Sequence, residues 1–381
     1  MNVRIGDHSR LHLDFSGRRK EQSYFFYFPG FSTYGETDVD SYSVNPRFTS
    51  QFQAAGLTHN TTVGWDLYDY RLENRSAAGK GDIGDPTSTK DLDQRQTAWY
   101  FHDVMTLDRW SFTLGARRLN VDTETETTGF SAGQGEDSQD AEMYEGGVRY
   151  HFDGGLDVFA GAQRSVRIVN ADEITPDDEL LEPQTGEQYT LGASWQKGLQ
   201  TSTLTAWQGR FDNEIVFNPY AGGFGSNVNL EDRTLRRGVS LNSRWRLDRD
   251  LTLVLNGTLQ RAEFDEGEWE GNDVPLVSRQ LFYAQANWQA LSWLELSLAH
   301  RYVGKRRFDN DQPNDFQQID SYRMTDLEAT ARYQNAYLRI GAYNLEDELA
   351  ADYGVKATNN LSYNAYPLPE RHYRVSLGME F

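Results

Sequence analysis

The 381-residue sequence contains no cysteine and no long apolar run. Without cysteine the chain can have no disulfide, no thiolate metal site and no cysteine nucleophile. No stretch of about 18 consecutive apolar residues is present, which excludes a membrane-spanning helix. The net charge of −20 disfavours polyanions such as nucleic acid as partners.

The residues after Met1 lack the features of a secretion signal. Positions 2–11 read NVRIGDHSRL, which has neither a cationic start nor an apolar stretch. The sequence therefore predicts that no signal peptide is encoded here.

Aromatic residues are abundant for so polar a chain, at 13% of all residues, with 20 Phe, 21 Tyr and 9 Trp. This content suits the aromatic girdles of a membrane β-barrel. In a soluble β-sandwich the same residues would fill the strands. The polar composition is compatible with a spanning barrel, because only every second residue of its strands faces lipid.

The last ten residues alternate between two kinds of side chain, which is the period-2 pattern of a half-buried strand. One face of the predicted strand is apolar and ends the chain on an aromatic residue; it carries Tyr373, Val375, Leu377, Met379 and Phe381. A terminal strand of this kind is typical of the closing strand of an outer-membrane barrel, where it guides assembly. The alternative is an edge strand of a soluble sandwich.

A unit of two long strands, one tight turn and one polar loop recurs along the chain. Tight turns are predicted near residues 56–58, 107–108, 153–154, 197–198, 248–249, 290–291 and 334–335. The last six lie about 42 to 51 residues apart, and each is flanked by strands of about 10 residues or more. Residues 24–40 and 75–90 are predicted to be long loops.

A β-propeller blade has a similar length, but it needs four short strands and three turns. Strands of ordinary soluble proteins also cluster near about 5 or 6 residues. Tight turns on one side and long loops on the other favour a membrane barrel.

The two faces of the predicted strands differ in the environment they require. Each exposed Leu, Val or Phe forfeits about 1.5 to 3 kcal/mol relative to burial, so the apolar faces must meet lipid or a second sheet. The opposite faces carry charges that a wide barrel would turn into its polar lumen; these are Arg149, Arg244, Arg246 and Glu295.

Several stretches of the second half are similar to the TonB-dependent outer-membrane receptors, in the order in which that family has them. They are LEPQTGEQYTLGASW from Leu181, NVNLEDRTLRRGVSL from Asn227, GNDVPLVSRQLF from Gly271, RYVGKRRFDNDQPN from Arg301, YNLEDELAADYG from Tyr343 and PLPERHYRVSLGMEF from Pro367. The first half resembles the family only in the rhythm of its strands and loops.

The resemblance implies an all-β fold, an antiparallel transmembrane β-barrel of the outer membrane, with about 16 strands of a probable 22. Residues 1–381 would form the C-terminal part of the barrel. The plug domain, the energy-coupling box and the first strands of the family have no counterpart in this sequence.

The resemblance also implies a function and a set of partners. The chain would be the barrel of a receptor that takes up a ferric siderophore or a similar large chelate such as cobalamin. Its partners would be outer-membrane lipid and the barrel assembly machinery, together with TonB if a plug and coupling box exist upstream. It would be no enzyme and would need no cofactor. A passive porin-like channel and a soluble propeller or sandwich binding protein stay open as alternatives.

Three motifs in the loops have plain interpretations. The GxGxxG at residues 79–84 is expected to be a loop, because no helix start follows it. The acidic clusters could supply oxygen ligands for calcium but lack EF-hand spacing, so we expect solvated loops; they are Asp172, Glu173, Asp177 and Asp178, and Asp309, Asp311 and Asp315. The seven His are scattered, and no metal site is predicted.

Aromatic residues in the predicted loops are the candidates for ligand contact, because exposed rings at a barrel mouth can stack on a large, flat ligand. They are Tyr24, Phe25, Tyr27, Phe31, Trp269, Phe308, Tyr363 and Tyr366. Arg306 and its neighbour Arg307 could pair with an anionic chelate.

Overall fold

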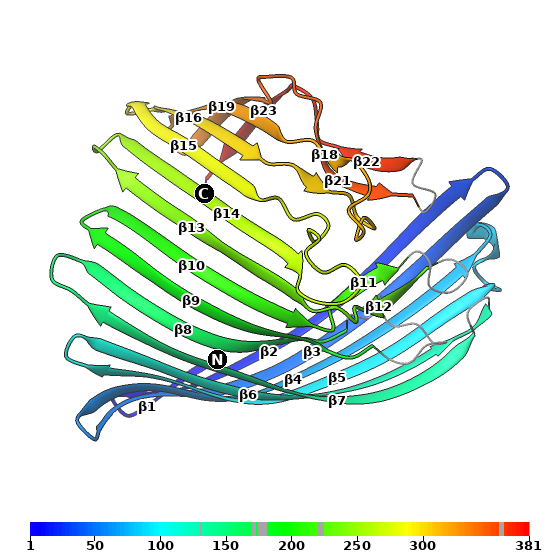
Figure 1. Cartoon of the computed structure of the whole chain (residues 1–381), viewed down its shortest axis with the longest axis horizontal. Helices are drawn as coiled ribbons and strands as arrows, with labels where there is room; N and C mark the ends of the chain where they lie inside the picture. The colour runs from blue at the N-terminus through cyan, green and yellow to red at the C-terminus, as the bar shows by residue number, and fades with distance from the viewer. Residues whose placement is uncertain (130–131, 170–172, 174–180, 219–224, 358–361, 381) are drawn as a thin grey trace.

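A computed structural model describes residues 1–129, 132–169, 173, 181–218, 225–357 and 362–380. Seventeen strands form one continuous antiparallel sheet, in which each strand pairs with the next in the chain apart from the short loop strands (Figure 1). The strands of the sheet are β1 (Asn2–Ile5), β2 (Ser9–Phe28), β3 (Phe31–Ala54), β4 (Leu57–Ala77), β5 (Ser88–Leu107), β6 (Trp110–Thr127), β7 (Gly133–His151), β8 (Leu156–Arg167), β9 (Gln184–Lys197), β10 (Gln200–Asp212), β13 (Thr234–Arg246), β14 (Leu251–Phe264), β15 (Gln280–Leu291), β16 (Leu294–Val303), β19 (Tyr322–Tyr333), β20 (Ala336–Tyr343) and β23 (His372–Met379).

The remaining elements lie in the loops. They are the 3-10 turn η1 (Lys80–Asp82) and three small hairpins, β11 (Ile215–Asn218) with β12 (Ser226–Asn229), β17 (Arg306–Arg307) with β18 (Gln318–Ile319), and β21 (Ala351–Lys356) with β22 (Tyr363–Pro367). No helix among the described residues is long and apolar enough to cross a membrane.

The sheet curves into a barrel wall (Figure 1). Within the described residues β1 and β23 do not pair with each other, so they form its two edges. A single meander of this length confirms the predicted antiparallel barrel class and rules out a propeller, whose blades are separate four-stranded sheets. The seventeen strands of the sheet agree with the expectation of about 16.

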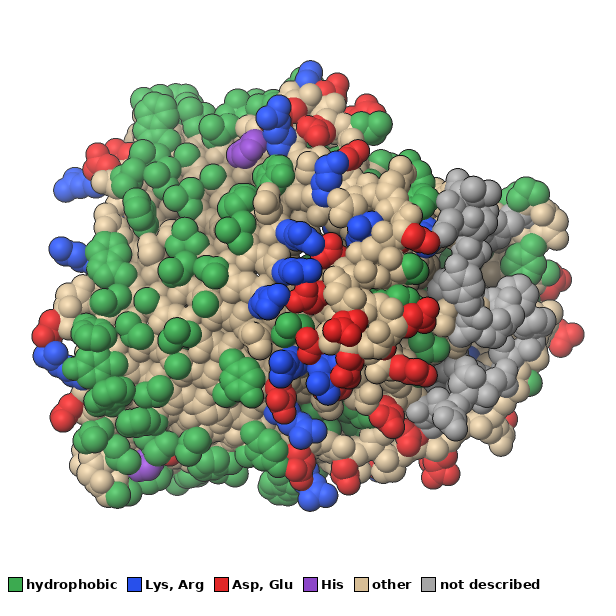
Figure 2. Space-filling model, viewed as in Figure 1, with side chains coloured by type: hydrophobic (Ala, Val, Ile, Leu, Met, Phe, Trp, Pro, Cys, Tyr) green, Lys and Arg blue, Asp and Glu red, His purple; other side chains and the backbone are tan. Residues whose placement is uncertain are grey.

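The convex face of the sheet is apolar in the half nearest the tight turns. Leu204, Leu241 and Phe282 lie on one row of this face, where the register pairs Leu204 with Leu241, Leu241 with Gly257 and Gly257 with Phe282. Their exposed fractions are 50%, 40% and 45%. Figure 2 shows the apolar band over the half of the sheet nearest the tight turns. Such a band is stable only where hydrocarbon replaces water.

The concave face is polar and holds ion pairs between strands of the sheet. Arg117 Nη1 lies 2.6 Å from Asp66 Oδ2, and Arg149 Nη1 lies 3.2 Å from Asp157 Oδ2. By register, Arg244, Arg246 and Glu295 also alternate onto this face. The predicted division between an apolar outer face and a polar inner face is therefore confirmed.

The tight turns lie where the sequence predicts them. The turn after β3 uses Ala55 and Gly56, both with positive φ, at 50° and 81°. This backbone matches the right-handed twist of the two flanking strands. At the β7–β8 turn a Cβ on Gly155 would lie 1.9 Å from the carbonyl oxygen of Gln196, so only glycine fits there.

The long loops predicted at residues 24–40 and 75–90 are wrong in extent. Strands β2 and β3 run through the first of them and meet at a two-residue turn, Pro29–Gly30, where Phe28 pairs with Phe31. The second shrinks to residues 78–87 between β4 and β5. Residues 24–28 are an unbroken aromatic run and residues 88–90 are polar, so neither stretch carries the alternation of apolar and polar residues that would mark it as a strand.

The GxGxxG at residues 79–84 contains only the three-residue turn η1, which confirms its assignment to a loop. The C-terminal alternation is also confirmed. Strand β23 pairs with β20 and exposes Tyr373, Val375, Leu377 and Met379 by 73%, 68%, 81% and 58%. Phe381 lies outside the described residues.

The opposite faces of β14 provide a direct test of the lipid-facing assignment. Leu255→Arg places a charge in the middle of the apolar band and is expected to lower the free energy of unfolding by about 2 to 4 kcal/mol in lipid vesicles. Asn256→Arg points to the polar interior and should change it by less than about 1 kcal/mol. Urea titrations followed by tryptophan fluorescence measure both; equal losses in the two variants would contradict the assignment.

Candidate ligand-binding site

The loop side of the sheet carries two hairpins that dock on each other. We call β17, β18, β21, β22 and residues 308–316 the loop platform. Asp309 and Val355 form a parallel bridge between the two hairpins. The amide of Asp309 donates to Gly354 O at 2.9 Å, and the amide of Lys356 donates to Asp309 O at 3.0 Å. These backbone bonds fix residues that are more than 40 positions apart in the chain.

Three aromatic rings form the centre of the platform. The ring of Phe308 lies 5.5 Å from that of Phe316 and 4.9 Å from that of Tyr363, and the last two rings are 6.0 Å apart. Phe308 is buried, at 3% exposure, whereas Tyr363 is 48% exposed. A Cβ on Gly354 would lie 2.5 Å from the Phe308 ring, so a glycine at this position leaves room for the ring. Phe308 therefore supports the exposed ring of Tyr363.

Arg306 joins the two hairpins of the platform. Its side chain is buried, and Nη2 donates to the carbonyl oxygens of Ala351 and Asp352, each at 2.7 Å. The guanidinium also lies 5.8 Å from the centre of the Tyr322 ring. These contacts engage Arg306 inside the protein, and it presents little surface to a chelate at the barrel mouth.

A buried charged network underlies the aromatic rings. Lys356 Nζ lies 3.0 Å from Asp315 Oδ1 and 3.6 Å from Asp311 Oδ1. Asp311 is fully buried and accepts hydrogen bonds from the amides of Asp315 and Phe316 at 3.1 and 3.2 Å. Burial raises the pKa of the Asp311 carboxyl, while the Phe316 amide, Lys356 and Arg307 oppose that rise.

The solvated loop expected around Asp309, Asp311 and Asp315 is therefore wrong for Asp311, whose charge is offset inside the protein. Asp309 accepts a hydrogen bond from the Tyr353 hydroxyl at 2.6 Å, and desolvation raises the pKa of that tyrosine. No group of acidic or His residues in the described part of the chain is arranged to hold a metal ion.

Three residues of the other acidic cluster lie outside the described residues; they are Asp172, Asp177 and Asp178. Glu173 pairs with Arg167. The calcium interpretation of this cluster thus stays untested.

Trp269 lies in the loop between β14 and β15 and forms a second cluster with the loop between β10 and β13. Its ring meets that of Phe264 edge to face, with centres 5.5 Å apart, and it packs on a small core that includes Leu230 and Val274. Asn272 Nδ2 donates to Gln312 O at 3.0 Å, which links this cluster to the loop platform. Trp269 is thus half-buried and helps to hold two loops together.

The remaining candidates lie at two exposed places. Phe25, Tyr27 and Phe31 flank the turn of the β2–β3 hairpin and are exposed by 60%, 70% and 62%. Tyr24 is partly buried, and its ring lies 5.3 Å from that of Phe26. On the platform, Tyr366 is 58% exposed and its ring lies 5.3 Å from that of Tyr353.

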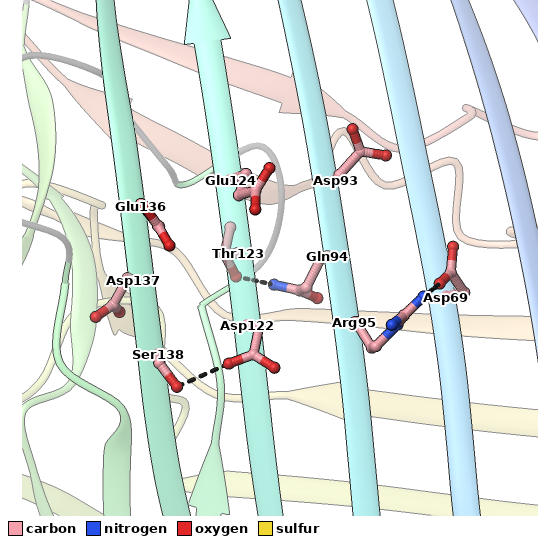
Figure 3. A pocket seen from close by; sticks show the side chains of 10 residues that line it. All are labelled: Asp69, Asp93, Gln94, Arg95, Asp122, Thr123, Glu124, Glu136, Asp137 and Ser138. Carbon is pink, nitrogen blue, oxygen red and sulfur yellow. Dashed lines mark hydrogen bonds and ion pairs between the residues drawn. The ribbon is translucent and has the colours of Figure 1, made fainter.

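The outer side of the β4–β7 extensions holds an acidic hollow of about 740 Å³ (Figure 3). Its carboxylates come from four adjacent strands and include Asp93, Glu124 and Glu136. The one cation that lines it, Arg95, is engaged by Asp69 at 3.1 Å. This surface repels anions, and it lies outside the barrel rather than in its mouth.

The sequence did not single out Phe316, Tyr353 or Lys356, although all three shape the platform. Phe316 and Lys356 lie in polar stretches with no periodicity, so only long-range pairing brings them beside Phe308 and Asp311.

Lys356→Met tests the buried network, because it removes the cation nearest to Asp311. The variant should lose about 3 to 5 kcal/mol of local unfolding free energy near pH 8. Asp311 already has a raised pKa, and its pKa rises further without Lys356. Stability tied to a raised pKa is present at low pH and is lost as pH rises through it. The deficit should therefore shrink toward pH 5. Hydrogen exchange of the Phe316 amide, measured at both pH values, gives the local unfolding free energy from which this deficit is calculated.

The control is Lys305→Met, whose ion pair with Asp320 is exposed. It should change the local unfolding free energy at the Phe316 amide by no more than about 1 kcal/mol at either pH. A Lys356→Met deficit that is the same at pH 5 and pH 8 would contradict the role given to Asp311.

Comparison with known proteins adds to this geometry. Residues 5–345 match the family described as TonB dependent receptor-like, beta-barrel. The ferrioxamine receptor of Yersinia enterocolitica is 23% identical over 385 residues, which cover 91% of this chain and 51% of that protein. The chain therefore spans about half the length of this relative.

Solved structures share the fold. The ferric citrate transporter FecA in its unliganded form superposes with a TM-score of 0.84 at 15% identity, covering 100% of this chain and 60% of that one. The ferric-catecholate import receptor Fiu of E. coli K12 gives a TM-score of 0.79 at 14% identity, with 99% and 62% covered. With the family match over most of its length, the chain belongs to the TonB-dependent receptor β-barrel family.

Proposed function

We propose that this chain forms the barrel of an outer-membrane receptor that takes up a ferric siderophore. The family match over residues 5–345 carries the proposal. The relative named a ferrioxamine receptor, and the ferric citrate and ferric-catecholate structures, support an iron chelate as the cargo class. Energy for uptake would come from TonB, as the family name indicates.

The loop platform and the β2–β3 turn would make the first contacts with the chelate. Both lie on the loop side of the sheet, opposite the tight turns (Figure 1). The exposed rings of Tyr363, Tyr366, Tyr27, Phe25 and Phe31 are available for stacking. Tyr24, Trp269, Phe308 and Arg306 would act indirectly, because they support these surfaces from within.

Charge favours a neutral or cationic chelate over a polyanionic one. The chain carries a net charge of −20. The platform cations Arg306 and Lys356 are 4% exposed and face carbonyl oxygens or carboxylates of the protein. A negative surface slows the approach of like-charged ligands and speeds that of cations, in a way that salt screens.

The binding test uses ferrioxamine B, which bears a free ammonium group, and ferric citrate, which is anionic. We expect calorimetry with the detergent-solubilised chain to give saturable binding of ferrioxamine B, about tenfold tighter than that of ferric citrate at low salt. Added salt should weaken the former and strengthen the latter. Cyanocobalamin serves as a third ligand of similar bulk. Preference for cyanocobalamin, or binding of no ferric chelate, would contradict the proposal.

Tyr363→Ala tests the platform as a contact surface. Removing an exposed stacking ring should weaken ferric chelate binding by about 0.5 to 1.5 kcal/mol, which is roughly two- to tenfold. The matched control is Tyr333→Ala, because Tyr333 is 77% exposed but lies beside the tight turn after β19. Calorimetry measures both variants. Equal affinities for the two variants would remove the platform from the proposed site.

A further inference from the structure

Three polar side chains lie together on the inner face of the sheet, beside the tight turns. Strands β6, β7 and β8 are neighbours there (Figure 1). Ser111 is the second residue of β6, His151 is the last residue of β7, and Asp157 is the second residue of β8. Alternation places all three on the concave face, with Arg149. We call Ser111, His151 and Asp157 the rim triad.

Two hydrogen bonds link the rim triad through the imidazole ring. His151 Nδ1 lies 2.8 Å from Asp157 Oδ1, and His151 Nε2 lies 3.0 Å from Ser111 Oγ. An ionised carboxylate can only accept, so Nδ1 carries the proton of the neutral imidazole and Nε2 is an acceptor. The hydroxyl of Ser111 therefore donates to Nε2. This is the order of nucleophile, base and orienting acid in a Ser–His–Asp triad, which is recognised by geometry and not by sequence position.

No other histidine of the described residues has a hydroxyl on one ring nitrogen and a carboxylate on the other. His59 and His102 each pair with a carboxylate alone, and His300 bonds to a hydroxyl alone. His12 lies between an amide and a hydroxyl. The arrangement at His151 is therefore more than the general polarity of the inner face.

The tight turns hold the base next to the nucleophile. The amide of His151 donates to Arg109 O at 2.8 Å, which ties the end of β7 to the start of β6. Arg109 Nη2 donates to both carboxylate oxygens of Asp153, at 2.9 and 2.8 Å, and so links the β5–β6 turn to the β7–β8 turn. The rim triad is thus carried on paired strand ends, which gives the precise positioning that catalysis requires.

Arg149 provides a positive charge beside the serine. The register places it directly opposite Ser111, where the β carbons of an antiparallel pair lie about 4.5 to 5.5 Å apart. Its Nη1 donates to Asp157 Oδ2 at 3.2 Å, and its guanidinium lies 4.9 Å from the centre of the Phe159 ring. The side chain is 41% exposed, so the guanidinium stays open to the barrel interior. A donor at this place can stabilise the negative oxygen that forms when a serine attacks a carbonyl.

We propose that the rim triad hydrolyses an ester at the inner rim of the barrel. Ser111 Oγ forms a bond to the carbonyl carbon, and its proton passes to His151 Nε2. The C–O bond to the alcohol then breaks, and the alcohol leaves with the proton from His151. His151 next takes a proton from water, which attacks the acyl group; the carboxylic acid leaves, and the proton returns to Ser111 Oγ.

The surroundings of the rim triad favour a small, polar ester. The register places Thr106 opposite Ser111 and Ser194 opposite Asp157, so hydroxyl groups flank the rim triad on both sides. The substrate reaches this face from the water inside the barrel, whereas long acyl chains lie at the opposite, apolar face. The activity requires neither iron nor the loop platform, so it stands apart from the uptake of a chelate.

The test uses the full chain folded in detergent, with p-nitrophenyl acetate, p-nitrophenyl palmitate and a fluorophosphonate probe. The probe forms a bond from phosphorus to a nucleophilic serine and releases fluoride. We expect peptide mass spectrometry to find the probe on Ser111, and the acetate to be hydrolysed faster than the palmitate. A folded chain that carries no probe on Ser111 would overturn the proposal. Faster hydrolysis of the palmitate would overturn the assignment to a small, polar ester.

Variants separate catalysis from a structural role. Ser111→Ala should lower kcat/KM for p-nitrophenyl acetate at least about hundredfold. The matched control is Ser194→Ala, because this inner-face hydroxyl bonds to Thr203 at 3.0 Å and to no histidine; it should change kcat/KM by less than about twofold. Asp157→Asn should slow labelling of Ser111 at least about tenfold, because the imidazole loses the partner that fixes its tautomer. Equal activity of the two serine variants, or unchanged labelling in Asp157→Asn, would contradict the rim triad.

Discussion

The structure depends on one constraint, which is that every strand must present apolar side chains on one face while its backbone groups pair with both neighbours. Hydrocarbon offers no hydrogen bonds to the backbone, so an unpaired strand cannot face it. Among the described residues, the ladder satisfies this requirement in the strands between the two edges, β1 and β23. Alternation then sends Leu204, Leu241 and Phe282 outward and leaves charges such as Arg117 and Asp66 inside.

The loops follow a different rule from the wall. They have no lipid to bury their apolar residues, so they build small cores of their own, such as the one around Phe264 and Trp269. Backbone bonds from Asp309 and the side chain of Arg306 hold the hairpins of the platform in place. The exposed rings are thus carried on a scaffold whose charged groups mostly pair with other groups inside the protein. A rigid, ring-bearing surface with few free cations suits the recognition of a bulky chelate that is not strongly anionic.

Sequence periodicity sufficed for the barrel class, the tight turns and the face of each clearly alternating strand, because these depend on local pattern. Strand length was underestimated in the first half, because the extensions of β2 to β7 lack a regular alternation of apolar and polar residues. The site was predicted less well. Arg306 and Phe308 were expected at the surface and are buried, because their partners, Ala351 and Tyr363, are more than 40 positions away. Composition alone cannot reveal such pairings.

The absence of cysteine allows the central claim, that one face of this sheet meets lipid, to be measured directly. Single cysteines would replace each residue from Leu253 to Gln260 on β14 and carry a nitroxide spin label in lipid vesicles. The account predicts a period of two: labels at odd positions collide with oxygen dissolved in the bilayer, and labels at even positions collide with a water-soluble nickel complex. Uniform access of the nickel complex to all eight positions would contradict it.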